Sequence, residues 1–366
     1  MRKNIYFFIG TEAELIKVFP VILECQKRNM HCHIIASGQN DLNKSRILQY
    51  VILNGKYLEL SKEENIKKSA VGLLTWFVKT RLGAVKKIKK EFTNDELKDS
   101  AFVVHGDTVS TFMGAMIGKK LGCKVCHVEA GLRSHDLFNP FPEEIDRLLT
   151  SRLARIHFAP GKEAAANLSK VKGQVIDTEF NTILDSLRFS KEIPLISEKI
   201  GELRDKDYFV FVMHRQENLM NREFVGSVID KIKTLSKKCR CVLILHKITE
   251  NTLEDMKLLD ELKQDKQFVL LPRVDYFDFM KLLGNAQYVI TDGGSNQEEL
   301  HYMGKPCLIM RKTTERQEGI GENAILFGGD VKEILAFADK YQEYAGVSIA
   351  SDKSPSAVIA ECLEKN

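Results

Sequence analysis

Acidic, imidazole and glycine residues follow the predicted strands of this 366-residue chain at the point where each strand ends. In the first half, His105-Gly-Asp107 and Glu129 come directly after two apolar runs, and Pro142-Glu-Glu144 follows a few residues later. In the second half, His214-Arg215 and Asp292-Gly-Gly-Ser295 hold the same position. Carboxylates and imidazoles transfer protons in enzymes, and a glycine turn that opens a helix can hold a diphosphate. The pattern therefore indicates acid–base chemistry on a phosphorylated ligand.

Each of these residues also has a purely structural explanation. Asp107 suits the N-cap of a helix, where an acid interacts favourably with the helix dipole. Glu143 and Glu144 follow a proline, which is a routine composition for a first helical turn. His214 could be a hydrogen-bonded structural histidine, and the glycine turn could be an ordinary strand–helix corner. The placement of all of them at successive strand ends is what favours a site.

The elements that must position these residues alternate along the chain. Ten short apolar runs are predicted as strands: Ile5–Ile9, His33–Ala36, Phe102–Val104, Val125–Val128, Ile156–Phe158, Phe209–Met213, Val242–Leu245, Val269–Leu271, Tyr288–Thr291 and Cys307–Met310. Stretches with helical periodicity lie between them, for example Glu14–Lys27, Phe224–Leu235 and Tyr276–Gly284. Buried strands that alternate with helices form parallel sheets covered on both faces. We predict an α/β protein with two Rossmann-like doubly wound domains facing across a cleft.

The domain boundary is expected where polar sequence interrupts this alternation, near residues 165–185. We predict a first domain over residues 1–175, which carries the carboxylates, and a second over residues 176–350. Residues 351–366 are predicted to form a helix that crosses back to the first domain. Ligands of such folds bind outside the carboxyl ends of the strands, so the cleft between the domains is the expected site.

Composition argues against several classes of protein. Hydrophobic residues make up 44% and charged residues 28%, as in ordinary globular proteins. The net charge of +4 suits an anionic substrate, while the densest basic run, Lys86–Lys90, indicates a solvated helix face rather than a nucleic-acid partner. No apolar stretch approaches the ~18–20 residues that span a bilayer. The apolar part of the N-terminus is too short for a signal peptide, so we expect a cytoplasmic protein without a membrane partner.

Cysteine and glycine spacings predict neither a metal nor a cofactor. The eight cysteines lie mostly in apolar runs, and Cys123-Lys-Val-Cys126 has no second matching pair, so we expect no metal site. The spacing of Gly293-Gly-Ser295 is not Gly-x-Gly-x-x-Gly, and the chain has no Gly-Lys-Ser/Thr motif. Neither a nicotinamide enzyme nor a P-loop enzyme is indicated.

Together these motifs resemble those of the bacterial UDP-N-acetylglucosamine 2-epimerases, which have the two-domain GT-B fold. The matching segments run from Gly10-Thr11 to about Gly328, nearly the whole chain. The most specific are His105-Gly-Asp-Thr108, His127-Val-Glu-Ala-Gly-Leu-Arg133, Pro142-Glu-Glu144 with Arg147, Asn181-Thr182, His214-Arg215 with Glu217, and Thr313-Thr-Glu-Arg316.

The resemblance implies epimerisation at C2 of UDP-N-acetylglucosamine, or of a modified UDP-N-acetyl sugar, by elimination and re-addition of UDP. It implies catalytic roles for Asp107, Glu129, Glu143 and His214. In the family, Phe279 lies beside the uracil, while the glycine turn and its second glutamate hold diphosphate and ribose. The full set of implied substrate-binding residues is Lys17, Arg147, Arg215, Phe279, Gly294, Ser295 and Glu299. A homodimer, a role in surface-polysaccharide synthesis and a reaction without metal or redox cofactor are also implied.

The chain departs from the family pattern on the side of the nucleotide. An arginine expected near the phosphates is Glu12, the glycine turn has its hydroxyl at Ser295, and a Gln-His pair is Gln39-Asn40. Because the catalytic carboxylates are spared, we expect a shifted substrate rather than an inactive protein. The alternatives are a hydrolysing relative that releases N-acetylmannosamine, a GT-B glycosyltransferase, and a non-catalytic protein that binds nucleotide sugars.

Overall fold

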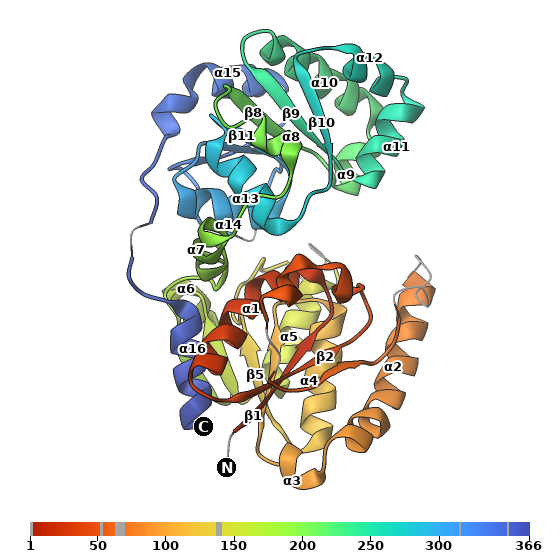
Figure 1. The fold of residues 1–366 in the computed structure, drawn as a ribbon, viewed down its shortest axis with the longest axis vertical. Helices are drawn as coiled ribbons and strands as arrows, with labels where there is room; N and C mark the ends of the chain where they lie inside the picture. Colours follow the sequence, from red (N-terminus) through yellow and green to blue (C-terminus); the bar gives the residue numbers. More distant parts are fainter. Residues whose placement is uncertain (1–2, 52–53, 63–69, 137–140, 315, 350) are drawn as a thin grey trace. The chain divides into compact units, whose positions relative to one another are not determined.

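The computed structural model describes residues 3–51, 54–62, 70–136, 141–314, 316–349 and 351–366 (Figure 1). The motif residues Asn139, Pro140 and Glu315 lie outside these described residues. The chain divides into two compact units, the first formed by Met1–Ser186 with Lys353–Asn366 and the second by Leu187–Asp352. Each unit is a parallel sheet with flanking helices. The predicted pair of doubly wound α/β domains is therefore confirmed.

In its described part, the first unit has a seven-stranded parallel sheet of order β3-β2-β1-β4-β5-β6-β7. The strands are β1 Asn4–Ile9, β2 His31–Ala36, β3 Tyr57–Glu59, β4 Ala101–His105, β5 Lys124–Val128, β6 Ile156–Ala159 and β7 Gln174–Asp177. The five strands predicted for this half are all present. The edge strands β3 and β7 were not predicted, because they are short and only partly buried and so lack a continuous apolar run.

Helices cover this sheet on both faces (Figure 1). They are α1 Glu12–Lys27, α2 Ala70–Glu91, α3 Asn94–Leu97, α4 Val109–Leu121, α5 Glu143–Leu153, α6 Lys162–Asn167 and α16 Pro355–Lys365, with 3-10 turns at Leu42–Lys44 and Arg46–Gln49. The C-terminal helix α16 packs against α1, so the two ends of the chain belong to the same unit. Helix α7, Ile183–Glu192, begins in the first unit and ends in the second.

The described part of the second unit has a six-stranded parallel sheet of order β10-β9-β8-β11-β12-β13. The strands are β8 Tyr208–Val212, β9 Arg240–Leu245, β10 Phe268–Pro272, β11 Val289–Thr291, β12 Cys307–Ile309 and β13 Ala324–Leu326. All five strands predicted for this half are present, and the edge strand β13 is the addition. Phe209 and Phe211 of β8 are fully buried, and such a side chain contributes roughly 1.5–3 kcal/mol to the free energy of unfolding.

The helices of the second unit are α8 Glu198–Gly201, α9 Gln216–Leu219, α10 Arg222–Ser236, α11 Lys247–Asp255, α12 Leu259–Gln264, α13 Tyr276–Asn285, α14 Gly294–Met303 and α15 Lys332–Lys340, with a 3-10 turn at Tyr341–Tyr344. Among the helices of the described chain, none has the length and apolar character needed to cross a membrane.

The strand order reverses once in each sheet, between β1 and β4 in the first unit and between β8 and β11 in the second. The connections that leave two such strands diverge to opposite faces, which opens a crevice at the carboxyl edge of the sheet. The residues that leave these strands are Gly10 after β1, Gly106-Asp107 after β4, His214 after β8 and Asp292 after β11. The fold thus brings Asp107, His214 and Asp292 to the switch points, while Glu129 follows the neighbouring strand β5.

Candidate active site

Glu129 lies at the centre of a buried group of polar side chains in the first unit. It follows β5, and its carboxylate accepts hydrogen bonds from the Lys17 ammonium and the Asn181 side-chain amide. His105 Nε2 lies 3.6 Å from Glu129 Oε2. These partners come from α1, from the segment before α7 and from the end of β4. Three segments distant in sequence therefore converge on one carboxylate.

The backbone at Glu129 is itself unusual. Its φ of 61° lies in the left-handed region, which costs a residue with a side chain about 1–3 kcal/mol. Two residues later, Gly131 has φ 88°, and a Cβ at this position would lie 2.1 Å from the carbonyl oxygen of Ala164. The tight turn after β5 requires this glycine, and it holds Glu129 in a strained conformation of the kind that clusters at functional sites.

Asp107 and Glu144 share Arg147, which is buried on α5. Arg147 Nη2 donates to Asp107, and Nη1 donates to Glu144 Oε2 at 2.8 Å. The N-cap of α4 is Thr108, whose hydroxyl accepts from the Thr111 amide at 3.1 Å. The structural explanation of Asp107 as a helix cap is therefore wrong, because its neighbour fills that role and leaves the Asp107 carboxylate to Arg147.

Glu144 is the most strongly held carboxylate of this region. It also accepts from Arg133 and from the Ser134 amide, the latter at 3.1 Å. Burial opposes its ionisation, but these hydrogen bonds and the two guanidinium charges outweigh burial and lower the pKa of Glu144. Glu144 therefore anchors the segment that precedes α5, a role that the sequence did not reveal.

Glu143 is the first residue of α5, as expected for an acid after a proline. The helix places Asp146 one turn further on, where its side chain is buried. Burial, followed by the charges of Glu143 and Asp107, raises the pKa of Asp146 to about 7. Two of the predicted catalytic carboxylates, Asp107 and Glu143, thus act electrostatically on one further carboxyl group that sequence reasoning missed.

Two buried groups hold the loops that carry these residues. Glu14 accepts from the Gly10 amide at 2.8 Å and from the Thr108 hydroxyl at 2.7 Å, and burial raises the pKa of Glu14 to about 7. His127 Nε2 lies 2.8 Å from the Gly106 carbonyl oxygen. Burial lowers the pKa of His127 to about 3, so the ring is neutral and donates its single N–H to that carbonyl. The turns after β1 and β4 are consequently tied to the sheet.

In the second unit, Asp292 organises the loop that contains His214. Its carboxylate accepts from the His214 amide at 3.0 Å and the Arg215 amide at 2.9 Å, and His214 Nδ1 lies 3.1 Å from Oδ1. Burial opposes ionisation, but the hydrogen bonds from His214 and Arg215 outweigh it and lower the pKa of Asp292. His214 is therefore both hydrogen-bonded, as its structural explanation requires, and partly exposed, as a catalytic role requires.

Two arginines lie at the N-terminus of α14. A Cβ at Gly294 would lie 2.9 Å from Arg316 Nη1 and 3.2 Å from Arg311 Nη1. Arg316 Nε is 3.3 Å from Glu298 Oε2, and Gln297 Nε2 donates to the Arg316 carbonyl oxygen at 3.0 Å. The amide groups of a helix N-terminus and two guanidinium groups form a favourable environment for a diphosphate.

The remaining predicted ligand residues of this unit also lie near the carboxyl edge of its sheet. Phe279 is in the first turn of α13, after β10, and Ser295 is the second residue of α14. Glu299 is buried and accepts from Asn296 Nδ2 at 3.0 Å. Arg215 Nε donates to the Asp292 carbonyl oxygen at 3.0 Å. Contacts of these residues with a nucleotide stay predictions.

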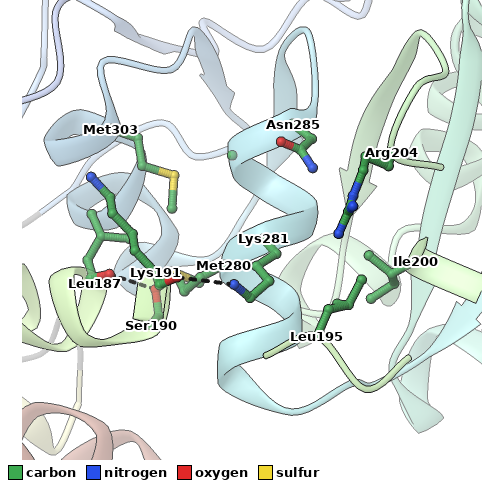
Figure 2. A pocket seen from close by; sticks show the side chains of 11 residues that line it. Leu187, Ser190, Lys191, Leu195, Ile200, Arg204, Met280, Lys281, Asn285 and Met303 are labelled. Atoms are coloured by element: carbon green, nitrogen blue, oxygen red, sulfur yellow. Dashed lines mark hydrogen bonds between the residues drawn. The ribbon is translucent and has the colours of Figure 1, made fainter. Parts of the chain in front are cut away.

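A pocket of about 360 Å³ in the second unit lies elsewhere (Figure 2). Its lining includes Gly284 and Asn285 at the end of α13 and Met303 at the end of α14. These helix ends precede the next strands, so the pocket lies at the amino edge of the sheet, away from Asp292 and Gly294. Lys281 Nζ in this pocket donates to the carbonyl oxygen of Lys191 at 3.4 Å. The pocket is therefore separate from the candidate site.

All eight cysteines are within the described ranges, none forms a disulfide, and burial raises the pKa of several, including Cys126 and Cys307. Among the described residues, no group of three or more His, Cys, Asp or Glu side chains is arranged to hold a metal ion.

Comparison with known proteins adds a family to this geometry. The family model described as UDP-N-acetylglucosamine 2-epimerase matches residues 23–355. A UDP-N-acetylglucosamine 2-epimerase of Methanocaldococcus jannaschii is 32% identical over 339 residues, which cover 89% of this chain and 88% of that protein.

Solved structures agree with the sequence match. The M. jannaschii UDP-GlcNAc 2-epimerase in complex with UDP-GlcNAc and UDP superposes with a TM-score of 0.80 at 27% identity, covering 99% of this chain and 100% of that chain. The Neisseria meningitidis enzyme bound to UDP-GlcNAc gives 0.80 at 26% identity, again over 99% and 100%. These neighbours have the GT-B architecture that the resemblance implied. The chain belongs to the UDP-N-acetylglucosamine 2-epimerase family.

Proposed function

We propose that the protein interconverts UDP-N-acetylglucosamine, or a modified UDP-N-acetyl sugar, and its C2 epimer. The observation that carries this proposal is the group around Glu129, in which a strained, buried carboxylate is held by Lys17 and Asn181 beside His105. A carboxylate held in this way has a defined orientation, which general acid–base catalysis requires.

The reaction explains why several carboxylates are needed. The C2 proton of the sugar is not adjacent to a carbonyl group, so its removal requires that a leaving group depart from C1. A base takes the C2 proton as the C1–O bond breaks, and UDP leaves with the electron pair of that bond. UDP then adds back to the resulting glycal, and an acid returns a proton to the other face of C2. We assign this base and acid to the group Asp107, Glu129 and Glu143.

The second unit supplies the features that the leaving group needs. Departing UDP accumulates negative charge on its diphosphate, and groups that stabilise this charge lower the barrier. The α14 N-terminus at Gly294, with Arg311 and Arg316 beside it, has the required positive potential. His214, held by Asp292, is the fourth catalytic residue that we propose.

Proton NMR in deuterated water tests this proposal. Purified protein is incubated with UDP-N-acetylglucosamine, and conversion to the manno isomer with deuterium at C2 is expected. Release of free UDP and N-acetylmannosamine would instead assign the protein to the hydrolysing class. If neither exchange nor UDP release occurs with this sugar or with modified UDP-N-acetyl sugars, the proposal is wrong, and transfer to an acceptor is tested next.

We also propose that the protein is a homodimer. Val71, Leu74, Val78 and Leu82 form one exposed stripe on α2, with exposed fractions of 75%, 64%, 45% and 69%. Apolar side chains at this helical spacing are typical of a face that a partner covers. Light scattering should give twice the chain mass, and Leu74→Lys with Leu82→Glu should give a monomer. An unchanged mass in this variant would contradict an interface through α2.

A cytoplasmic location remains a prediction from the sequence pattern, and a role in surface-polysaccharide synthesis remains a prediction from the family resemblance. The absence of a required metal or redox cofactor is also a prediction. Activity that survives treatment with a chelator would support it.

A further inference from the structure

Asp146 is a buried carboxyl group that the proposed reaction does not use. Its side chain lies on α5, one turn after Glu143, and the residue is 7% exposed. Within the described residues, its Oδ2 is buried and has no hydrogen-bond partner. An ionised carboxylate that is buried without a partner is strongly unfavourable, so the group takes up a proton instead.

The guanidinium group of the next residue does not supply Asp146 with a hydrogen-bond partner. Arg147 directly follows Asp146, but its Nη1 and Nη2 donate to Glu144 and Asp107. The charges that act on Asp146 come from Glu143 on its own helix and from Asp107 in the β4–α4 connection, and both are negative.

Among the described residues, the Arg133 guanidinium reaches α5 from outside the helix, and it is paired with Glu144. On β5 the facing titratable group is His127, whose lowered pKa of about 3 keeps it neutral. On α4, which packs along α5, the lysines Lys119 and Lys120 are in the last turn, far in sequence from the Asp107 end of that helix. The structure therefore surrounds Asp146 with conditions that favour its protonated form.

We propose that Asp146 is a positioning residue that holds a proton between the catalytic carboxylates Asp107 and Glu143. As a neutral acid, it limits the negative charge of the group, so that Asp107 keeps its pairing with Arg147. When Asp146 loses this proton, a further negative charge acts near Asp107, whose guanidinium partner Arg147 also serves Glu144. This inference rests on the proposed function for the roles of Asp107 and Glu143, but the proton itself is independent of it.

The proton can be tested without any turnover. Infrared difference spectra of the whole protein, wild type minus Asp146→Asn, should show the C=O stretch of a protonated carboxylic acid at pH 6, and this band should vanish at pH 9. Asp95→Asn, which alters an exposed acid on α3, is the matched control and should give no such band. A wild-type spectrum without the band at pH 6 would overturn the proposal.

The positioning role is tested by the pH profile of C2 deuterium exchange. Asp146→Asn keeps the shape and the neutrality of the protonated acid, so its rate at pH 6 should stay within about threefold of wild type. Above pH 7 the wild-type rate should fall as Asp146 ionises, whereas the variant rate should stay level. Superimposable profiles would overturn the role. Absence of exchange in both proteins, with the infrared band present, would refute the proposed function and leave the proton assignment standing.

Discussion

The carboxyl edges of the two sheets carry different sets of charged side chains. In the first unit, Asp107 and Glu144 share Arg147, Glu144 also pairs with Arg133, and the charges that act on Asp146 are negative. In the second unit, Arg311 and Arg316 flank a helix N-terminus at Gly294. In the proposed function, the same doubly wound fold presents proton-transferring groups in one unit and anion-binding groups in the other. The difference teaches that the switch point of the fold specifies where a site lies, while the loops specify its chemistry.

The largest effect is expected from Glu129→Gln in the first unit. The amide preserves the shape but cannot accept a proton at neutral pH, and Lys17 loses the charge of its partner. We expect the rate of C2 exchange to fall about 1000-fold. Glu91→Gln on α2 is the exposed control and should keep the wild-type rate. Near-normal exchange in Glu129→Gln would remove this residue from the acid–base group.

A smaller loss of activity is expected from Asp292→Asn in the second unit. The side chain still has one acceptor oxygen, but its amide group opposes the amides of His214 and Arg215. Loss of charge-assisted hydrogen bonds should lower the free energy of unfolding by about 1.5–3 kcal/mol. Misplacement of His214 should lower kcat/KM about 100-fold. Denaturant titration and steady-state kinetics measure the two effects, and unchanged kinetics would show that the orientation of His214 is immaterial.

Arg311→Lys should weaken nucleotide binding without abolishing it. Lysine keeps the positive charge beside Gly294 but loses the planar pair of donors that suits a phosphate. Calorimetry should show about tenfold weaker binding of UDP. The matched control is Arg240→Lys at the start of β9, which lies at the opposite edge of the same sheet. Equal weakening in both variants would refute a specific diphosphate site at Gly294.

The two smallest effects concern the pH dependence of stability, and the first of them is in the first unit. The pKa of Glu14 is raised to about 7 in the folded protein, from an ordinary value of 4.5. The folded state therefore binds a proton that the unfolded state releases, and its stability falls as pH rises from about 4.5 to about 7. Glu14→Gln should remove about 1 kcal/mol of this decline per pH unit. Urea denaturation at pH 5.5 and 6.5 measures the slope, and equal slopes in both proteins would contradict the shift.

His246 in the second unit should show the opposite slope. Burial, followed by the charge of His214, lowers the pKa of His246 from 6.5 to about 4. The unfolded state therefore binds a proton that the folded state does not, and stability rises from about pH 4 to about pH 6.5. His246→Asn should flatten this rise in the same titration. A rise that persists unchanged would mean that another group is responsible.

Much of the fold was predictable because buried parallel strands require continuous apolar runs. Every predicted strand is present, from β1 with its buried Ile5–Ile9 segment to β12 at Cys307–Ile309. The edge strands β3, β7 and β13 were not predicted; each is short, with three or four residues, and none is fully buried. The edge strand β10 is also partly buried, but its longer apolar run at Phe268–Pro272 was recognised.

The candidate site likewise has residues that the sequence predicted and pairings that it did not. Asp107, Glu129, Glu143 and His214 were identified by their places after strands and by family resemblance. The partners of these residues were not identified, because Asn181 reaches Glu129 across 52 positions of sequence and Arg147 reaches Asp107 across 40. Helix and strand periodicities extend over a few residues, so they do not indicate contacts between residues so far apart in sequence. Asp146 was missed because nothing in a helical pattern distinguishes a buried acid from a solvated one.

The sequence by itself determined the two parallel sheets, the succession of their strands along the chain and the types of residue that follow each strand. These features depend on local apolar patterning and turn chemistry. Only the tertiary structure decided which acids are paired, which are buried and which have a strained backbone. Ionisation depends on burial and on charges brought close by distant segments. Thr108 rather than Asp107 caps α4, and the Asp107 carboxylate accepts from Arg147 instead. The partner of a side chain depends on which distant segments the fold brings near it.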